Sequence, residues 1–263
     1  MKNYVIFLKK ELVESAKTYK LLIMGAVFLI FGMLSPFSAR YMPEILKWAM
    51  ESDPATAGMD FGTLMTTPVA FDSWAQFYSN VGTMGFIALV AVFSNMISSE
   101  MSRGTLTILL SKGLSRATIM YAKITSAIII WTCSFCLSFL TAWGYTLYFF
   151  EDKVSNLFLS MFCLWVFGVF LIALTAFFAA ITNKGYACMF SVGGVVISLS
   201  LFNIISQIEK ISPMSLSGRS IQLLNDSLVP KDFIVPIIIA FISIVVFILL
   251  SVLFFNKKKK STN

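Results

Sequence analysis

The stretch FIVPIIIAFISIVVFILLSVLFFN occupies residues 233–256 and contains no Asp, Glu, Lys or Arg. An α-helix rises about 1.5 Å per residue, so about 20 residues cross the roughly 30 Å of hydrocarbon in a bilayer. A charge at the centre of such a helix costs about 2.5–3.5 kcal/mol on insertion scales. An uncharged run of this length therefore predicts a helix that spans a membrane.

Five further uncharged runs precede this one, at residues 21–39, 73–99, 124–150, 154–183 and 185–208. We therefore predict an all-α membrane protein with six transmembrane helices, at approximately residues 21–39, 76–98, 124–149, 155–182, 186–208 and 233–255. The composition is 58% hydrophobic with a mean hydropathy of +0.85, and no stretch is long enough for a soluble catalytic domain. Residues 1–263 are predicted to form a single transmembrane domain.

The basic residues are sorted by side. If the N-terminus is cytoplasmic, six spans return the C-terminus to the same side, and the cytoplasmic segments hold 14 of the 20 Lys and Arg but only three of the 13 acidic residues. This is the positive-inside distribution, so we expect both termini to be cytoplasmic. Lys257–Lys260 follow the last span directly and suit an anionic inner leaflet better than nucleic acid. We therefore expect a lipid bilayer and no nucleic acid as a partner.

Residues 1–20 precede the first span and predict an interfacial helix. Tyr4, Leu8 and Leu12 recur on one helical face, and lysines lie on the polar side. A frayed cytoplasmic tail is the alternative.

The residue types argue against chemistry on this chain. It contains no His, which is the commonest general base and a frequent metal ligand, and its four cysteines all lie within predicted spans. We therefore expect no metal site and no catalytic residues, and we do not expect an enzyme.

The connection between the second and third spans, residues 99–123, is the most informative loop. A simple turn needs about four or five residues, whereas this loop has about 25. Its apolar core, Leu106 and Ile108–Leu110, lies between charged ends. An amphipathic element held under the membrane by two spans is suited to bind a cytoplasmic partner.

This loop resembles the corresponding loop of the ABC-2 family of ABC transporter permeases. In that family a Glu is followed by Gly-Thr-Leu, then Leu-Leu-Ser, a short spacer, Ser-Arg, and a Lys that enters the third span. The matching residues are Glu100, Gly104, Thr105, Leu106, Leu109, Leu110, Ser111, Ser115, Arg116 and Lys123. The family usually has Pro in the spacer where this chain has Lys112-Gly113, which leaves the local turn open. The layout is also similar, with an interfacial helix, six spans, and re-entrant-like external helices around Ser212-Pro213 before the last span.

The resemblance implies that residues 99–123 are a coupling helix that docks on a separate ATP-hydrolysing subunit. The residues expected to couple the chain to that subunit are Glu100, Arg103, Gly104, Thr105, Leu106, Leu109, Leu110, Ser111, Arg116 and Lys123. It also implies a complex of two permease chains, identical or homologous, with two ABC ATPase subunits in a bacterial cell (plasma) membrane. This chain has no Gly-x4-Gly-Lys-Ser/Thr phosphate loop, so we expect it to bind no cofactor, with ATP and Mg on the partner ATPase.

Glu100 and Arg116 flank the loop, and we expect both at the level of the headgroups. Glu100 would orient the start of the loop helix, and Arg116 would bind a lipid phosphate or a carboxylate of the partner. An exposed pair contributes under about 1 kcal/mol to stability, so its loss is expected to uncouple the transporter rather than unfold it.

A polar stripe runs along the predicted third span. Ser134, Ser138, Thr141 and Tyr145 fall at i, i+4, i+7 and i+11. The stripe is either a face of the transport pathway or a helix seam held by side-chain hydrogen bonds. The amides of Asn95 and Asn203 raise the same question.

The predicted function is the membrane-spanning permease subunit of an ATP-driven ABC exporter. The spans lack the buried charges that a proton or sodium relay needs, so the energy would come from the ATPase. The 26 Phe and 14 Met suit an adaptable apolar surface, and hence a hydrophobic or amphipathic substrate such as an antimicrobial or toxic peptide or a drug. The alternatives are a non-transporting membrane immunity or sensor protein for toxic peptides, and an ATP-independent carrier.

Overall fold

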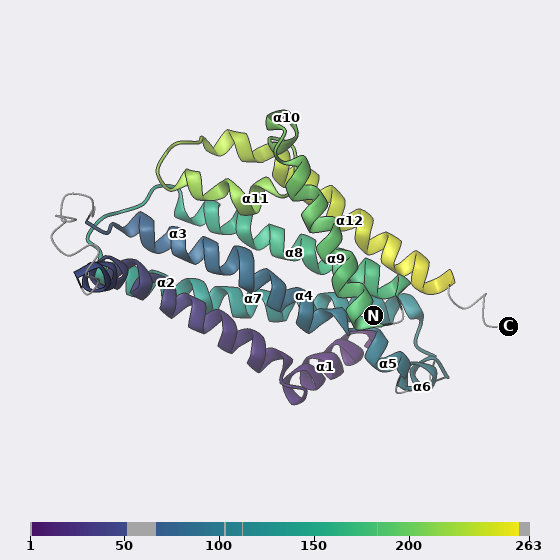
Figure 1. Cartoon of the computed structure of the whole chain (residues 1–263). Coiled ribbons are helices and arrows are strands. Elements are labelled where there is room, and N and C mark those ends of the chain that lie inside the picture. Colours follow the sequence, from purple (N-terminus) through teal and green to yellow (C-terminus); the bar gives the residue numbers. More distant parts are fainter. Residues whose placement is uncertain (1, 52–66, 103, 112, 183, 258–263) are drawn as a thin grey trace.

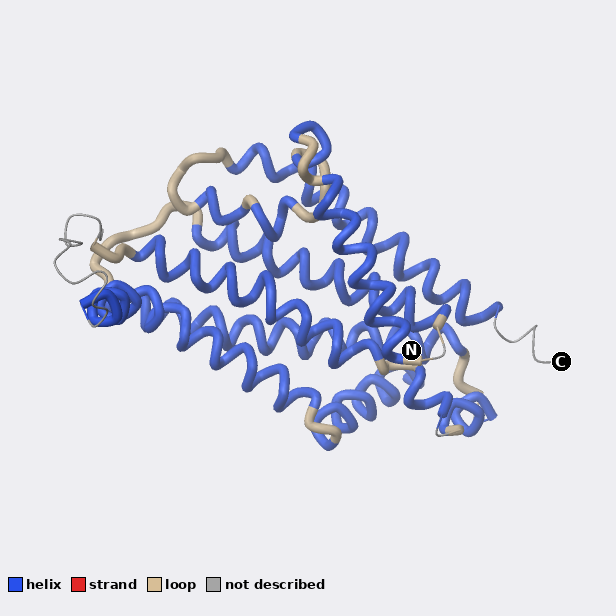
Figure 2. The backbone as a smooth tube through the Cα atoms, viewed as in Figure 1, coloured by secondary structure: helices blue, strands red, loops and turns tan. Residues whose placement is uncertain are grey.

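The computed structural model describes residues 2–51, 67–102, 104–111, 113–182 and 184–257, and these residues form helices and loops without a strand (Figure 2). In chain order the elements are α1 (Lys2–Lys17), α2 (Lys20–Glu51), α3 (Ala70–Asn80), the π-helix η2 (Val81–Gly85), α4 (Phe86–Ser94), α5 (Ser98–Ser102), α6 (Thr105–Ser111), α7 (Arg116–Phe149), α8 (Leu157–Ile181), α9 (Gly185–Phe202), α10 (Ser206–Glu209), α11 (Ser215–Gly218), the 3-10 helices η3 (Ser220–Leu223) and η4 (Pro230–Phe233), and α12 (Ile234–Lys257).

Six helical segments are long and apolar enough to cross a membrane, in agreement with the predicted all-α fold. They are Lys20–Ile45, Ala70–Glu100, Arg116–Phe149, Leu157–Ile181, Gly185–Phe202 and Pro230–Lys257.

Two helices extend well beyond the bounds that the sequence predicts. Helix α2 continues beyond residue 39, the predicted end of the first span, through Pro43 to Glu51. An ion pair between Arg40 and Glu44, four residues apart, supports this extension. Helix α7 begins at Arg116, before the predicted start of the third span near residue 124, because the hydroxyl of Ser115 accepts a hydrogen bond from the backbone N–H of Thr118 and caps the helix.

The bundle is organised around α7 and α8. Helix α2 packs along α7, and α12 packs along α8 (Figure 1). The centre is aromatic: the ring centroid of Trp131 lies 5.2 Å from that of Phe28 and 6.0 Å from that of Phe86, and Phe86 lies 5.0 Å from Phe167. Gly168 makes this packing possible, since a Cβ there would lie 2.3 Å from the Trp131 ring. Helix α8 is therefore the buried centre, whereas α9 lies at the surface with only 17% of its span buried.

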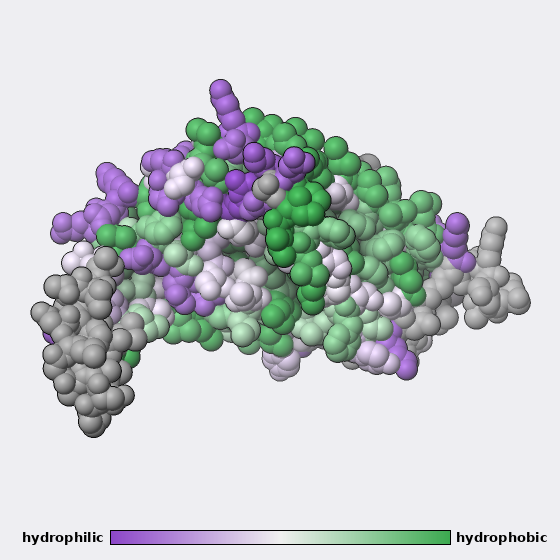
Figure 3. Space-filling view, turned by 45° about the horizontal axis from the view of Figure 1, so that its top comes forward, coloured by the Kyte–Doolittle hydropathy of each residue, from purple (hydrophilic) through white to green (hydrophobic). Residues whose placement is uncertain are grey.

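The two ends of the bundle differ in character. The first and last described residues lie at one end, together with α5 and α6, and we call it the terminal end (Figure 1). The opposite end, which we call the loop end, carries residues 67–69, 150–156 and 203–233. Hydrophobic residues cover much of the visible surface, and hydrophilic residues gather mainly towards the loop end (Figure 3).

The segment before the last span is inserted into the bundle at the loop end. Leu216, Leu223 and Leu224 are buried, and the hydroxyl of Ser160 on α8 donates to the carbonyl oxygen of Ser220 over 2.6 Å. This burial fits the re-entrant-like helices expected from the sequence.

Candidate functional site

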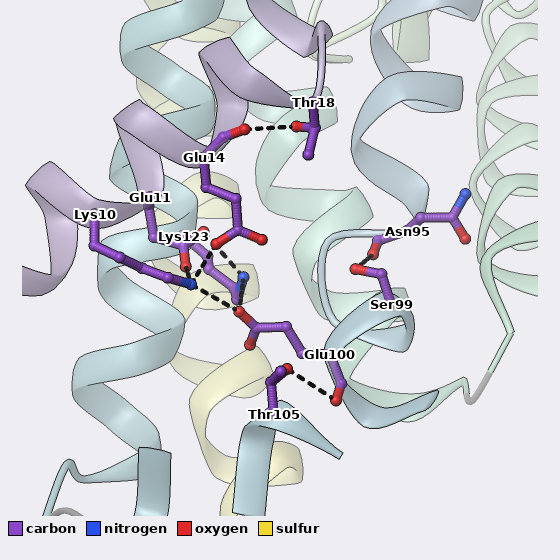
Figure 4. A network of polar contacts seen from close by, with 9 residues as sticks. All are labelled: Lys10, Glu11, Glu14, Thr18, Asn95, Ser99, Glu100, Thr105 and Lys123. Carbon is purple, nitrogen blue, oxygen red and sulfur yellow. Dashed lines mark hydrogen bonds and ion pairs between the residues drawn. The ribbon is translucent and has the colours of Figure 1, made fainter. Parts of the chain in front are cut away.

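A cluster of five charged side chains lies at the terminal end, where α1, α5 and α7 meet (Figure 4). This charge cluster consists of Lys10, Glu11, Glu14, Glu100 and Lys123. The Nζ of Lys123 lies 3.0 Å from Glu11 Oε2 and 3.0 Å from Glu100 Oε1. The Nζ of Lys10 lies 3.5 Å from the same oxygen of Glu100. Glu100 therefore joins the start of the loop to both the N-terminal helix and the third span.

Lys123 and the two carboxylates that it contacts are hidden from solvent. Glu11 and Lys123 are each 7% exposed, and Glu100 is 5% exposed. The expectation that Glu100 is exposed is wrong, because its carboxylate lies against Lys10 and Lys123 from two other helices. Although Glu100 Oε1 lies 3.0 Å from Lys123 Nζ, neither carboxylate oxygen of Glu100 makes an aligned hydrogen bond among the described residues. The attraction between Glu100 and Lys123 is therefore mainly electrostatic.

Helix α1 presents its inner face to this cluster. Phe7, Glu11 and Ser15 are buried at intervals of four residues, and the hydroxyl of Tyr4 donates to Thr125 Oγ1 over 2.8 Å. The inward face thus differs from the predicted Tyr4, Leu8 and Leu12 stripe by including a carboxylate.

The ion pairs set the charge state of the more exposed members. Burial alone would lower the pKa of Lys10, but its hydrogen bond to Glu14 and the charge of Glu11 raise that pKa above its ordinary value. Burial alone would raise the pKa of Glu14, but Lys10 lowers it. Both side chains therefore stay charged near neutral pH.

The cluster does not suit a divalent cation. The carboxylates of Glu11, Glu14 and Glu100 each place an oxygen within 4.8 Å of the others. However, the ammonium groups of Lys10 and Lys123 already lie between them (Figure 4), so a metal ion would have to displace two cations.

The loop after Glu100 is a compact turn–helix–turn. Gly104 and Gly113 have φ angles of +67° and +84°, a region that favours glycine, and they bracket α6. The hydroxyl of Thr105 donates to the carbonyl oxygen of Glu100 over 3.3 Å (Figure 4). Leu109 and Leu110 are half-buried against the core, while Ser111 is exposed.

The remaining residues of the predicted coupling set are dispersed. The guanidinium of Arg116 donates to the carbonyl oxygen of Phe255 over 3.2 Å and lies over its ring. It therefore binds the end of α12, where free carbonyl groups carry partial negative charge. Arg103 lies outside the described residues, and so does the side chain of Leu106.

The polar stripe on α7 lies largely against α2. A Cβ on Gly32 would lie 2.6 Å from the carbonyl oxygen of Ser138, so the two helix backbones touch there. Ser134 is buried, the hydroxyl of Thr141 donates to Leu137 within its own helix, and the ring of Tyr145 packs 5.3 Å from that of Phe37. The stripe therefore packs at a helix seam, but the hydroxyls of Ser134 and Ser138 have no hydrogen-bond partner among the described residues, so the side-chain hydrogen bonds expected at such a seam are not observed there. The pathway role stays a prediction.

Asn95 and Asn203 lie at helix ends rather than in the middle of spans. Asn95 follows α4, accepts a hydrogen bond from Ser98, and lies so close to Gly185 that a Cβ there would be 1.7 Å from its Oδ1. The amide of Asn95 thus serves a helix junction, whereas Asn203 caps α9 through its backbone N–H, and its side-chain oxygen has no hydrogen-bond partner among the described residues. A role of either amide in the pathway stays a prediction.

A separate apolar cavity lies between the second, fourth and fifth spans. It has a volume of about 370 Å³, and Gly82, Phe86, Phe167, Met189 and Gly193 are among the residues that line it. The π-helix η2 forms part of its wall, and such bulges often occur at functional sites. No sequence pattern points to this cavity, because its lining comes from segments far apart in the chain.

Comparison with known proteins gives a family match over nearly the whole chain. The model of a family described as ABC-2 family transporter protein matches residues 5–260. An uncharacterised transmembrane protein of Bacillus subtilis (strain 168), YxlG, is 26% identical over 169 residues, which cover 63% of this chain and 64% of that protein.

Proposed function

Because the chain belongs to the ABC-2 family of transporter proteins, we propose that it is the membrane-spanning permease subunit of an ATP-driven exporter. ATP would be hydrolysed, with Mg, on a separate ABC ATPase subunit. Two such subunits would assemble with this chain and a second permease chain, identical or homologous. The positive-inside distribution supports a cytoplasmic terminal end in a bacterial cell membrane.

The position of the charge cluster is the observation that carries this proposal. Loop residues Ser98–Ser111 hold the two short helices α5 and α6, which protrude at the terminal end (Figure 1). Such a protrusion is accessible to a cytoplasmic subunit. Glu100 ties it to α7 by a buried ion pair with Lys123, and to α1 by a contact with the partly exposed Lys10.

The same ion pairs give a route for force. Moving Glu100 away from Lys123 would leave a buried carboxylate with only the partly exposed Lys10 as an ion-pair partner among the described residues, so the contact resists separation. A push on α5 and α6 is therefore expected to move α1 and the start of α7 with them. Helix α7 is 34 residues long and continuous, so movement at one end would reach the loop end. The loop residues named above would then be the ATPase contact, and Glu100 and Lys123 would transmit the motion.

The apolar cavity supports a hydrophobic or amphipathic cargo, such as an antimicrobial or toxic peptide or a drug. Its lining is almost entirely carbon, and its volume of about 370 Å³ falls within the usual range for ligand sites. A charged cargo would find few polar partners there.

Co-purification tests the proposal. The tagged full chain is extracted from its own cells in mild detergent, and we expect an ABC ATPase to co-purify. The double variant Leu109→Asp and Leu110→Asp is expected to lose the ATPase while remaining in the membrane fraction. A matched control changes two exposed apolar residues at the loop end, Ile204→Asp and Ile205→Asp, and should retain it. Recovery of the wild-type chain without any ATPase, or normal ATPase binding by the Leu109 and Leu110 variant, would contradict the proposal.

A further inference from the structure

A second cavity, of about 520 Å³, lies at the loop end between α3, α7 and α8. Its inner wall includes Trp74, which is 1% exposed. Its outer wall includes Trp143, Leu147 and Phe158, which are 38%, 59% and 69% exposed. A cavity with one buried wall and one exposed apolar wall opens sideways, towards the hydrocarbon that surrounds the bundle.

The aromatic wall is preformed. Trp143 and Phe139 lie parallel, with an interplanar angle of 2° and ring centroids 6.3 Å apart. Phe139 also contacts Trp74 and Phe158, at 5.8 Å and 6.0 Å between centroids. Behind these rings the hydroxyls of Ser73 and Thr146 are hydrogen-bonded over 2.6 Å, which fixes α3 against α7.

The mouth of the cavity is polar and is also held in place. It is formed by Asp152, Lys153 and Asn156 in the connection between α7 and α8. The Ser155 hydroxyl donates to Asp226 Oδ2 over 2.7 Å, and the Asn156 side chain donates to Asp226 Oδ1 over 3.2 Å. Within the described part of the chain, Asp152 and Lys153 themselves have neither an ion pair nor a hydrogen bond from their charged groups.

The depth of the cavity matches a membrane interface. Trp143 precedes the end of α7 at Phe149 by six residues, or about 9 Å along the helix. Trp and Tyr side chains concentrate at the headgroup level, and Tyr145 and Tyr148 continue the same stretch of α7. We therefore expect the apolar wall at the level of the upper acyl chains, and Asp152 and Lys153 at the level of the headgroups.

We propose that this cavity binds one glycerophospholipid with a zwitterionic headgroup, such as phosphatidylethanolamine, from the leaflet at the loop end. The lipid phosphate pairs with Lys153, its ammonium group pairs with Asp152, and an acyl chain lies along Trp143, Leu147 and Phe158. Neighbouring acidic and basic side chains above an apolar wall complement a molecule with both charges above an apolar tail. In the topology proposed above, this is the outer leaflet. The site itself does not depend on transport.

Native mass spectrometry of the full chain in mild detergent tests the site. The protein is titrated with phosphatidylethanolamine, phosphatidylglycerol and diacylglycerol of the same acyl chains. We expect the first phosphatidylethanolamine to bind at least tenfold more tightly than diacylglycerol. Lys153→Glu, which reverses the charge, and Leu147→Trp, which fills the cavity, are each expected to weaken it about tenfold. Asp152→Asn is expected to weaken phosphatidylethanolamine but not phosphatidylglycerol.

Lys231→Glu is the matched control, because Lys231 is an exposed lysine at the same end that does not line the cavity. It should bind phosphatidylethanolamine as the wild type does. Equal lipid retention by wild type, Lys153→Glu and Leu147→Trp would mean that the lipids are only annular, and would overturn the proposal. Displacement of the lipid by an equal concentration of glycerophosphoethanolamine, which has no acyl chains, would also overturn it by indicating a site for soluble phosphate esters.

Discussion

The charge cluster predicts that its two central members respond very differently to substitution. The cluster holds three glutamates and two lysines, so it carries one negative charge in excess. Glu100→Gln removes that excess. Lys123→Met doubles it, and leaves the buried carboxylates of Glu11 and Glu100 with the partly exposed Lys10 as their ion-pair partner within the described part of the chain, although the charge of Lys20 is also near.

The distances set the expected magnitudes. Lys123 Nζ lies 3.0 Å from both Glu11 and Glu100, whose side chains are 9% and 6% exposed. Removing one partner of a buried pair costs about 3–5 kcal/mol, and we expect Lys123→Met to fall in this range. Glu100→Gln leaves Lys123 paired with Glu11, and the contact that it removes is not an aligned hydrogen bond. We therefore expect this substitution to cost about 1 kcal/mol.

The two single variants and the double variant form a cycle that measures the effect. Unfolding midpoints are measured in one detergent by tryptophan fluorescence. In the double variant, Glu100→Gln relieves the repulsion that Lys123→Met creates, so the double variant should be more stable than the sum of the single effects by at least about 1 kcal/mol. Lys9→Met, an exposed lysine of α1 outside the cluster, is the control. A Lys123→Met shift no larger than that of Lys9→Met, or additive effects in the cycle, would refute the reasoning.

Three further predictions concern pH, topology and packing. The pKa of Glu14 is lowered below its ordinary 4.5, so its ion pair stabilises the folded state above that pH, and this stabilisation is lost as the pH falls through the lowered value. The contribution is under about 1 kcal/mol, because the side chain is 39% exposed. Glu14→Gln should therefore flatten the acid limb of a plot of unfolding free energy against pH. In a background without native cysteines, Ser227→Cys should react with an impermeant thiol reagent outside intact cells and Ser111→Cys should not, and the opposite labelling would reverse the proposed orientation. Gly168→Ala should lower the free energy of unfolding by about 1–3 kcal/mol, because its Cβ would lie 2.3 Å from the buried indole of Trp131. Gly144→Ala is the control, because a Cβ there meets nothing within 4 Å. Equal unfolding temperatures of the two variants would contradict this packing.

The six spans are predictable because the bilayer penalises charge wherever a helix crosses it, whatever the helix packs against. Helix ends are less predictable. The Ser115 cap that starts α7 is a local signal and was readable, but it lies in a segment that hydropathy assigns to a loop. The continuation of α2 past Pro43 has no such signal, since Pro ordinarily disrupts a helix interior. Ile45 and Trp48 are exposed there, so burial against the bundle does not explain the continuation.

The candidate site was predictable only in part. The family pattern points to Glu100 and Lys123, yet nothing local shows that they pair, because 23 positions separate them. The second carboxylate that pairs with Lys123, Glu11, lies more than a hundred positions from it. In the sequence Glu11 counts only as one of the few acids on the cytoplasmic side. Phe7, Glu11 and Ser15 share the inner face of α1 at intervals of four residues. A search for apolar residues at helical spacing does not detect this face, because it includes a charged residue.

The short fifth span has a consequence for the surrounding membrane. Helix α9 has 18 residues, so it is about 27 Å long, and it falls short of an average hydrocarbon thickness of roughly 30 Å even without tilt. Helix α2, with 32 residues, has no such deficit. Hydrophobic mismatch of this kind is relieved by local thinning of the bilayer, at a fraction of a kcal/mol per ångström. We therefore expect the bilayer to be thinnest beside the helix that contributes Met189 and Gly193 to the apolar cavity, where the proposed amphipathic cargo would have the shortest distance to cross.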